Sequence, residues 1–206
     1  PASCCGLVGL KPSRGRHVAS PTQDLPIDIV TNGVVSKSVR DTANYFHGIE
    51  QFKQNKKLPS IGHVTGPSKR RLKIAVFSQN PAGIEAHVDV SKAVNNIGLK
   101  CQEMGHQVEF IANPYDDRII IDFLVYYSFL ARSLYSFGRL AVHPQFNIKK
   151  AEPFTIGLAK FFGRTMLHAP GSFRRLKNEV VMEQERLYDK YDVLLSPTVM
   201  EPVPKL

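Results

Sequence analysis

Residues 72–77 read LKIAVF, an apolar run bounded by basic residues before it and by SQNPAG after it. Such a run is typical of a buried strand. Apolar residues then recur at helical spacing from Val90 to Met104, and Gly105 stands where a helix commonly ends. A second strand-like run, QVEFI, follows at residues 107–111. Strand, helix and strand in this order predict two parallel strands joined by a right-handed crossover, and therefore the α/β class.

Segments on either side extend this unit into a mostly parallel sheet flanked by helices. YDVLLSPT at residues 191–198 is a third strand-like run, and residues 7–10 predict a buried strand. Pro170 and Gly171 are expected to separate the last two helices, and Ser36 or Ser38 to cap the first. Residues 51–71 predict a mobile surface loop. Residues 33–52 are expected to carry the first helix, and further helices are expected over residues 90–104, 117–137, 154–165 and 172–190.

Composition narrows the class of protein. The chain has 206 residues, 43% of them hydrophobic, which is enough to bury a core. A formal net charge of +9 invites a nucleic-acid interpretation, but the basic runs lack interleaved aromatic residues, so we expect no nucleic-acid partner. No long apolar run or signal peptide is evident, and residues 119–134 predict a buried helix, so we expect no membrane association. Three cysteines favour a reduced, cytoplasmic setting.

The residues alone reveal no catalytic or metal-binding motif. The seven histidines lack paired spacing and no Cys-x-x-Cys accompanies them, so we expect no metal and no cofactor. Cys4 and Cys5 could supply a nucleophile, but a buried structural role is favoured because no partnered base is evident. Arg40 and Asp41 fit helix capping and a local ion pair better than acid–base catalysis. The aromatic stripe at residues 123–137 fits core packing better than a ligand pocket.

Four stretches resemble, in order, the amidase signature family. PASCCGLVGLKPSRGR at residues 1–16 resembles the segment that follows the nucleophile of that family, and it is the most specific of the four. The others are GVVSKSVRDTA at residues 33–43, the strand–helix unit that ends in MGHQV at residues 104–108, and YDVLLSPT. Ser13 stands where the family usually has threonine, a change that keeps the hydroxyl. Residues 140–175 match no shared motif.

The resemblance implies a parent enzyme that hydrolyses the C–N bonds of carboxylic amides through a Ser–cis-Ser–Lys triad. In the family this triad lies upstream of the segment that matches Pro1, and further sheet strands follow the segment that matches Leu206. We therefore expect residues 1–206 to form a single partial α/β domain with an incomplete sheet. We also expect the chain to contain no catalytic residue and to be inactive alone.

The resemblance also implies where the non-reacting part of an amide substrate would bind. In the family the helical region that corresponds to residues 117–190 varies with the substrate, and the small-molecule amide is the expected partner of the parent. Cysteines of the first segment would lie near the scissile bond. The candidate pocket residues are Cys4, Cys5, Tyr126, Tyr127, Phe129, Arg132 and Thr198.

Two other functions stay open from the sequence. The chain could be a non-catalytic binding module that keeps an amidase-like scaffold. It could also be a subunit of an amidotransferase complex associated with transfer RNA, since some relatives form part of one. A sheet that is incomplete on both sides would expose unpaired edges and apolar faces, so we expect a homodimer through an exposed sheet edge.

Overall fold

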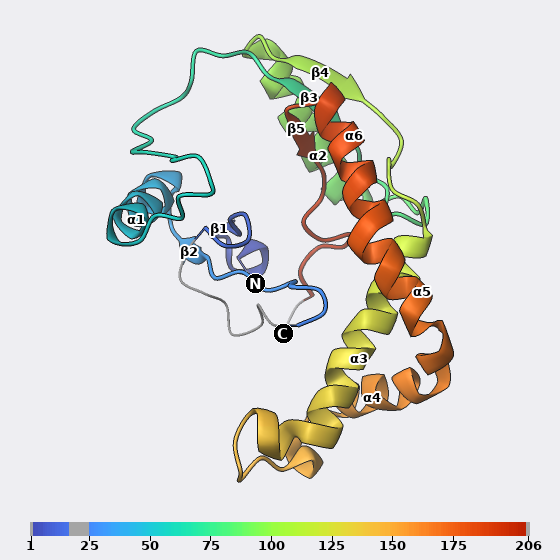
Figure 1. Ribbon diagram of the computed structural model, residues 1–206. Coiled ribbons are helices and arrows are strands. Elements are labelled where there is room, and N and C mark those ends of the chain that lie inside the picture. The colour runs from blue at the N-terminus through green and yellow to red at the C-terminus, as the bar shows by residue number, and fades with distance from the viewer. Residues whose placement is uncertain (1, 17–24, 205–206) are drawn as a thin grey trace. The chain divides into compact units, whose positions relative to one another are not determined.

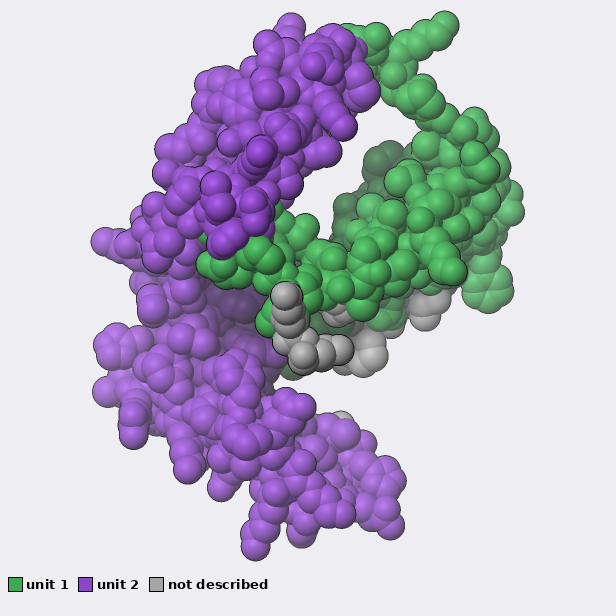
Figure 2. All heavy atoms as spheres, turned by 180° about the vertical axis from the view of Figure 1, so that it is seen from behind, with its two compact units in different colours: residues 1–71, 197–206 green, residues 72–196 purple. Residues whose placement is uncertain are grey.

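The computed structural model describes residues 2–16 and 25–204, and it divides the chain into two compact units (Figures 1 and 2). Unit 1 comprises residues 1–71 and 197–206, and unit 2 comprises residues 72–196. The single partial domain expected from the sequence stays a prediction.

Unit 2 contains a sheet of three parallel strands in the order β4-β3-β5. Lys73 lies opposite Gln107 in the register, and Ile74 lies opposite Val193. The α/β class and the parallel pairing predicted from LKIAVF are confirmed. The homodimer through a sheet edge stays a prediction, and among the described residues β4 and β5 are the outer strands of this sheet. The strands span Lys73–Val76 (β3), Gln107–Phe110 (β4) and Val193–Leu195 (β5).

Helix α2, Val88–Glu103, packs against β3 and β4. Its Val94 joins Ile74 and Val76 of β3 in a buried apolar cluster. Gly98 allows this close approach, because a Cβ atom at that position would lie 3.1 Å from side-chain atoms of both Val76 and Phe110. Residues 74–76 of β3 are all buried, whereas no residue of β4 is buried, so the central strand supplies most of the core of this sheet.

Helices account for most of residues 118–190, the segment that the sequence predicted as a helical region. The long helix α3 packs against α4 and α5 around two small apolar clusters, one centred on Val125 and Phe162 and the other on Ala131 and Leu158. Figure 1 shows these helices extending away from the sheet of the same unit. Their bounds are Arg118–Ala141 (α3), Pro153–Thr165 (α4), Ala169–Arg174 (α5) and Val180–Lys190 (α6), with 3-10 turns at Ile148–Lys150 and Met166–His168.

The helix expected over residues 172–190 begins earlier and contains a π-helical turn. Helix α5 starts at Ala169, so Pro170 and Gly171 lie in its first turn instead of separating two helices. Proline is tolerated there because its missing N–H would have no acceptor within the helix. The π-helical turn spans Arg175–Glu179 and leads directly into α6.

Helix α3 is, within the described part of the chain, the one helix long and apolar enough by composition to cross a membrane. Its inner face packs on α4 and α5, whereas Phe123, Phe137 and Leu140 are exposed. The core helix of a soluble protein satisfies the same length and hydropathy criteria, so this finding alone is weak evidence for a span. The absence of membrane association stays a prediction.

Unit 1 contains an antiparallel pair of short strands, β1 (Val8–Leu10) and β2 (Val34–Ser36). The strand predicted at residues 7–10 is present but not buried, since Leu10 is 44% exposed. The segment 33–52, which was expected to carry the first helix, also contains β2 ahead of that helix. A Cβ atom at Gly33 would overlap the carbonyl of Leu10, so this close approach of the two backbones requires glycine.

Helix α1 spans Val39–Phe52, and its N-cap is Ser38. The Ser38 Oγ accepts a hydrogen bond from the Asp41 N–H at 3.1 Å, which confirms one of the two predicted caps and a capping role around Asp41. Cys4 and Cys5 lie in a 3-10 turn, Ser3–Cys5, and both are exposed. The prediction that these two thiols are buried was therefore wrong.

Residues 53–72 contain no helix or strand, and part of this connection folds back onto α1. The Glu50 carboxylate accepts hydrogen bonds from the Ile61 and Gly62 N–H groups at 2.9 and 2.8 Å. The hydroxyl of Ser60 donates to the same carboxylate at 2.9 Å, and Arg16 lies 3.5 Å from it. The backbone hydrogen bonds lower the pKa of Glu50, so its charged form secures the loop.

Candidate functional site

The carboxyl ends of β3, β4 and β5 meet at one end of the parallel sheet, and polar residues follow each strand. Gln79 follows β3, Asn113 follows β4 and Ser196 follows β5. Ligands of open α/β sheets bind in the crevice outside this end of the strands. We therefore take the carboxyl end of the sheet in unit 2 as the candidate functional site.

Gln79 and Asn113 join the segments after β3 and β4. The Asn113 side-chain amide donates to the Gln79 carbonyl at 3.1 Å, and the Asn113 N–H donates to the Gln79 side-chain oxygen at 3.4 Å. The Asn113 Oδ1 in turn accepts from the N–H of Tyr115 at 2.8 Å. These contacts use local backbone groups that would otherwise need water, and they fix the direction in which both segments leave the sheet.

A carboxylate and two hydroxyls form a second cluster at this end. Ser78 and Ser91 both donate hydrogen bonds to Oε1 of Glu85, the latter at 3.0 Å. The hydrogen bond from Ser78 and then that from Ser91 lower the pKa of Glu85. A carboxylate with a lowered pKa is a weak proton acceptor, so this arrangement orders the turn after β3 better than it activates a serine.

Tyr115 connects the carboxyl end of the sheet to α6. Its ring packs edge-on against Phe77 at 6.2 Å between centroids. Burial, with a smaller contribution from Tyr188, raises the pKa of the Tyr115 hydroxyl, and a hydrogen bond with Gln184 opposes the shift. The hydroxyl therefore stays protonated at neutral pH and can act as a hydrogen-bond donor.

Two of the predicted pocket residues on α3, Tyr126 and Phe129, lie in an aromatic cluster. The Tyr126 side chain is fully buried, with its ring centroid 5.2 Å from that of Phe173 in an edge-on contact. Phe129 packs on Phe173 at 5.3 Å and on Phe162 at 5.5 Å. Neighbouring side chains cover Tyr126, so a substrate could not contact it directly in this arrangement. Tyr126 instead packs beneath the exposed surface of α3 and supports it.

The other two predicted residues of α3 are exposed. Tyr127 is 43% exposed and stacks on Phe123 with ring centroids 5.9 Å apart. The Arg132 guanidinium lies 5.5 Å from the centre of the Tyr135 ring. Both side chains are accessible to a ligand, and the arginine adds a cation beside an aromatic surface.

Asp122 and Arg175 form a bidentate ion pair that joins α3 to the π-helical turn after α5. Both nitrogen–oxygen distances are 2.6 Å, and the side chain of Asp122 is only 4% exposed. Burial alone would raise the pKa of Asp122, but hydrogen bonds with Arg175 and Ser172 and the charge of Arg175 outweigh burial and lower it. The carboxylate therefore stays ionised and holds the helices together.

Cys4, Cys5 and Thr198 belong to unit 1, and all three are exposed. The Cys4 Sγ lies 4.0 Å from the Ser3 hydroxyl. The predicted pocket combines these residues with residues of α3 in unit 2, and that combination stays a prediction. In residues 2–16 and 25–204, no group of three His, Cys, Asp or Glu side chains could hold a metal ion.

The sequence analysis did not single out Gln79, Glu85, Asn113 or Tyr115. The signal that could have found them is positional, since each lies shortly after a strand that was correctly predicted to be parallel to its neighbour. Polar residues just past the carboxyl ends of such strands are candidates whatever their motif.

Comparison with protein families and curated proteins gives a consistent result. A family model described as Amidase matches residues 1–206. The protein named "Putative amidase AmiC" of Mycobacterium tuberculosis is 38% identical over 208 residues, which cover 100% of this chain and 44% of the relative. The protein of the same name from Mycobacterium leprae is 39% identical, with the same coverage. The chain thus spans less than half the length of these relatives.

Solved structures share the fold. A 6-aminohexanoate cyclic dimer hydrolase superposes with a TM-score of 0.67 at 22% identity, over 92% of this chain and 42% of that one. A bacterial aryl acylamidase of the amidase signature enzymes superposes with a TM-score of 0.64 at 15% identity, over 84% of this chain and 38% of that one.

Proposed function

Because the chain belongs to the amidase family, we propose that it forms part of an enzyme that hydrolyses carboxylic amides. In that reaction water adds across the C–N bond, and the products are a carboxylic acid and an amine or ammonia. The observation that carries the proposal is the family match over all 206 residues, supported by 38% identity to a mycobacterial relative over the whole chain.

Residues 1–206 supply part of the scaffold around the active site, but they do not supply the nucleophile. The serine, the second serine and the lysine of the triad belong to a part of the enzyme outside residues 1–206. The parallel sheet of unit 2 orients the segments with Gln79 and Asn113 at its carboxyl end, where an open α/β sheet receives its ligand. Cys4, Cys5 and Thr198 are proposed to lie near the scissile bond.

Helix α3 holds the part of the substrate that does not react. Tyr127 and Arg132 present an aromatic face and a cation to solvent, and the buried Tyr126 and the half-buried Phe129 keep that surface of α3 fixed. Binding energy from such remote contacts orients an amide before the chemical step. An amide with an aromatic or anionic non-reacting portion suits this surface best.

The test uses the complete reading frame that contains residues 1–206, assayed with aliphatic, aromatic and carboxylate-bearing amides by release of amine or ammonia. Arg132→Gln is expected to raise KM for the preferred carboxylate-bearing amide by about tenfold while kcat changes little, because it removes ground-state binding. Arg164→Gln, which removes an exposed arginine of α4, is the matched control.

The outcomes separate the proposed function from the alternatives. Hydrolysis by the full reading frame and none by residues 1–206 alone supports the proposal. No hydrolysis of any amide by the full reading frame would overturn it and favour a non-catalytic binding module. Equal effects of Arg132→Gln and Arg164→Gln would overturn the role of α3 without touching the amidase assignment.

A further inference from the structure

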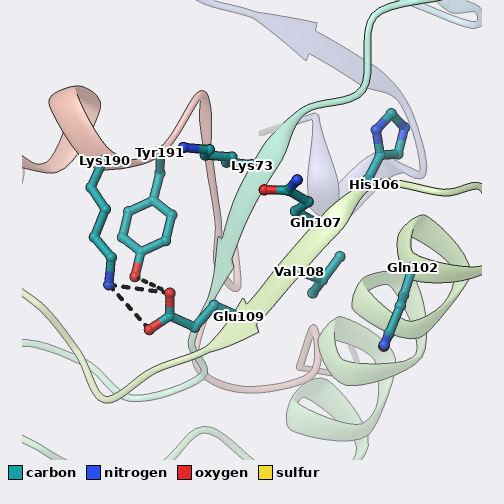
Figure 3. Close-up of a pocket in the computed structure, with 8 residues that line it drawn as sticks. All are labelled: Lys73, Gln102, His106, Gln107, Val108, Glu109, Lys190 and Tyr191. Carbon is teal, nitrogen blue, oxygen red and sulfur yellow. Dashed lines mark hydrogen bonds and ion pairs between the residues drawn. The ribbon is translucent and has the colours of Figure 1, made fainter.

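A polar cavity lies at the opposite end of the same sheet, where β3 and β4 begin (Figure 3). Its volume is about 560 Å³, within the range of small-molecule sites. The start of β3, strand β4, the last turn of α2 and the end of α6 supply its lining, so all of it belongs to unit 2. It is separate from the carboxyl end of the sheet, where the candidate site of the amidase lies.

The carboxylate of this cavity, Glu109, already has hydrogen-bond donors within the protein. Glu109 accepts a hydrogen bond from the Tyr191 hydroxyl at 2.8 Å, and the Lys190 ammonium lies 3.2 and 3.1 Å from its two oxygens (Figure 3). Tyr191 is 6% exposed, so it forms a fixed wall. The same ammonium lies 4.7 Å from the centre of the Tyr191 ring. The strongest acceptor in the cavity therefore has its donors within the protein.

His106 is oriented so that it offers a donor. Its Nδ1 accepts a hydrogen bond from the Leu72 N–H at 3.1 Å. A neutral imidazole whose Nδ1 is an acceptor carries its proton on Nε2. The contact also ties the loop between α2 and β4 to the start of β3, which fixes the position of the ring.

The remaining polar groups, an ammonium and two side-chain amides that can each donate or accept, have no partner in the described part of the chain. The Lys73 ammonium makes no ion pair or hydrogen bond there, and neither do the side-chain amides of Gln102 and Gln107. Lys73 and Gln107 lie opposite each other in the register of β3 and β4. The cavity thus combines unused donors, one of them cationic, with an acceptor that is already occupied.

We propose that this cavity binds a small molecule that bears anionic oxygens, of the carboxylate or phosphate class. Its anionic group contacts Lys73 and Gln107, which lie opposite each other on neighbouring strands (Figure 3). Such a ligand matches the donors that the protein leaves unused, and its charge is opposite to the net charge of +9 on the chain. The site is distinct from the proposed amide site and does not depend on amide hydrolysis.

The test titrates residues 1–206 with sodium phosphate and, separately, with sodium citrate at constant ionic strength, followed by calorimetry and by amide NMR shifts. Saturable binding with shifts at Lys73, His106 and Gln107 is expected for at least one anion. Phosphate alone would identify the phosphate class and citrate alone the carboxylate class. No saturation with either anion would overturn the proposal, and this measurement needs no variant.

Two variants separate the site from general attraction of anions to a basic protein. Lys73→Gln is expected to weaken binding about tenfold, because it removes a charge-assisted hydrogen bond. Lys92→Gln makes the same charge change on α2 outside the cavity and is expected to leave affinity unchanged. Equal weakening by the two variants would overturn the proposal. Far-UV circular dichroism shows that both variants are folded before they are compared.

Discussion

The sheet of unit 2 and the strand pair of unit 1 arise from similar short apolar runs, yet only the first becomes buried. Val76 of β3 is 1% exposed, whereas Leu10 of β1 is 44% exposed. Strand β3 has a neighbour on each side and packs against α2, while within residues 2–16 and 25–204 β1 pairs only with β2. Burial therefore follows from the number of packed layers around a strand and not from the apolar run itself.

Unit 1 relies more heavily on polar contacts. The Ser36 and Thr42 hydroxyls lie 2.8 Å apart and join β2 to α1, and Glu50 secures the connection that follows α1. A single hydrogen bond of this kind contributes less net free energy than burial of a large side chain. The comparison predicts that substitutions in unit 2 cost more stability than those in unit 1, and five experiments test it.

The largest effect is expected from Tyr126→Ala in α3. Tyr126 is fully buried among aromatic rings, so its removal should lower the free energy of unfolding by about 3–5 kcal/mol, as measured by urea denaturation. Tyr127→Ala, at the next position of the same helix, is 43% exposed and should cost less than about 1 kcal/mol. Equal costs for the two tyrosines would show that the described packing of α3 is wrong.

Asp122→Asn tests whether a polar contact in unit 2 contributes as much to the free energy of unfolding as burial of an apolar side chain does. It leaves Arg175 without its partner and should cost about 2–4 kcal/mol, because the pair is bidentate and Asp122 is nearly buried. The exposed Asp189→Asn is the matched control. If the loss in free energy of unfolding were no greater than for the control, the ion pair would not help to hold α3 in place.

The same pair predicts a pH dependence with a definite sign. The folded state lowers the pKa of Asp122 below its ordinary value of 3.8, so the unfolded chain takes up the proton first as pH falls. The stabilisation is fully present above that value and is lost as pH falls through the lower folded pKa. Urea midpoints measured downward from about pH 5 should therefore fall more steeply for the native chain than for Asp122→Asn.

Two glycines in helices are expected to respond with opposite signs. Gly98→Ala places a methyl group 3.1 Å from Val76 and Phe110, so it should destabilise unit 2 by about 1 kcal/mol despite the higher helix propensity of alanine. Gly157→Ala in α4 meets open space and should stabilise by about 0.5–1 kcal/mol. Thermal unfolding of the two variants checks the signs, and stabilisation by Gly98→Ala would contradict the close packing of α2.

The smallest effect on global stability is expected from Glu50→Gln in unit 1, where the response should be local. The neutral side chain accepts weaker hydrogen bonds, so the Ile61 and Gly62 amides should exchange hydrogen faster while the unfolding temperature barely moves. Because the folded pKa of Glu50 is lowered, the protection in the native chain should persist above the ordinary value of 4.5 and fade below it. Unchanged exchange at Ile61 would show that the carboxylate does not secure the loop, and Glu103→Gln is the control.

Local patterns in the sequence predicted much of unit 2. The apolar runs LKIAVF and QVEFI and the helical spacing from Val90 to Met104 correctly predicted parallel strands and the helix between them. Ser38 was among the predicted caps of α1 because a hydroxyl before a helix accepts from its free N–H groups. The resemblance to the amidase signature family was confirmed by the family match over residues 1–206.

Features that depend on distant partners could not be predicted in this way. The ion pair between Asp122 and Arg175 joins residues 53 positions apart, and no local pattern marks it. Strand β2 was not predicted, because its pairing with β1 depends on residues far upstream. The exposure of Cys4 and Cys5 likewise depends on what surrounds their turn, whereas their residue type favoured burial.

The π-helical turn at Arg175–Glu179 has a geometric consequence for everything that follows it. Each residue of an α-helix advances the chain by about 100° around its axis, so the wider turn of a π-helix shifts the angular phase between α5 and α6. Arg175 can therefore face Asp122 while α6 presents Gln184 toward Tyr115 and leads into Tyr191. Deleting one residue from this turn would restore a regular helix but rotate one half against the other, so the two sets of contacts could no longer coexist.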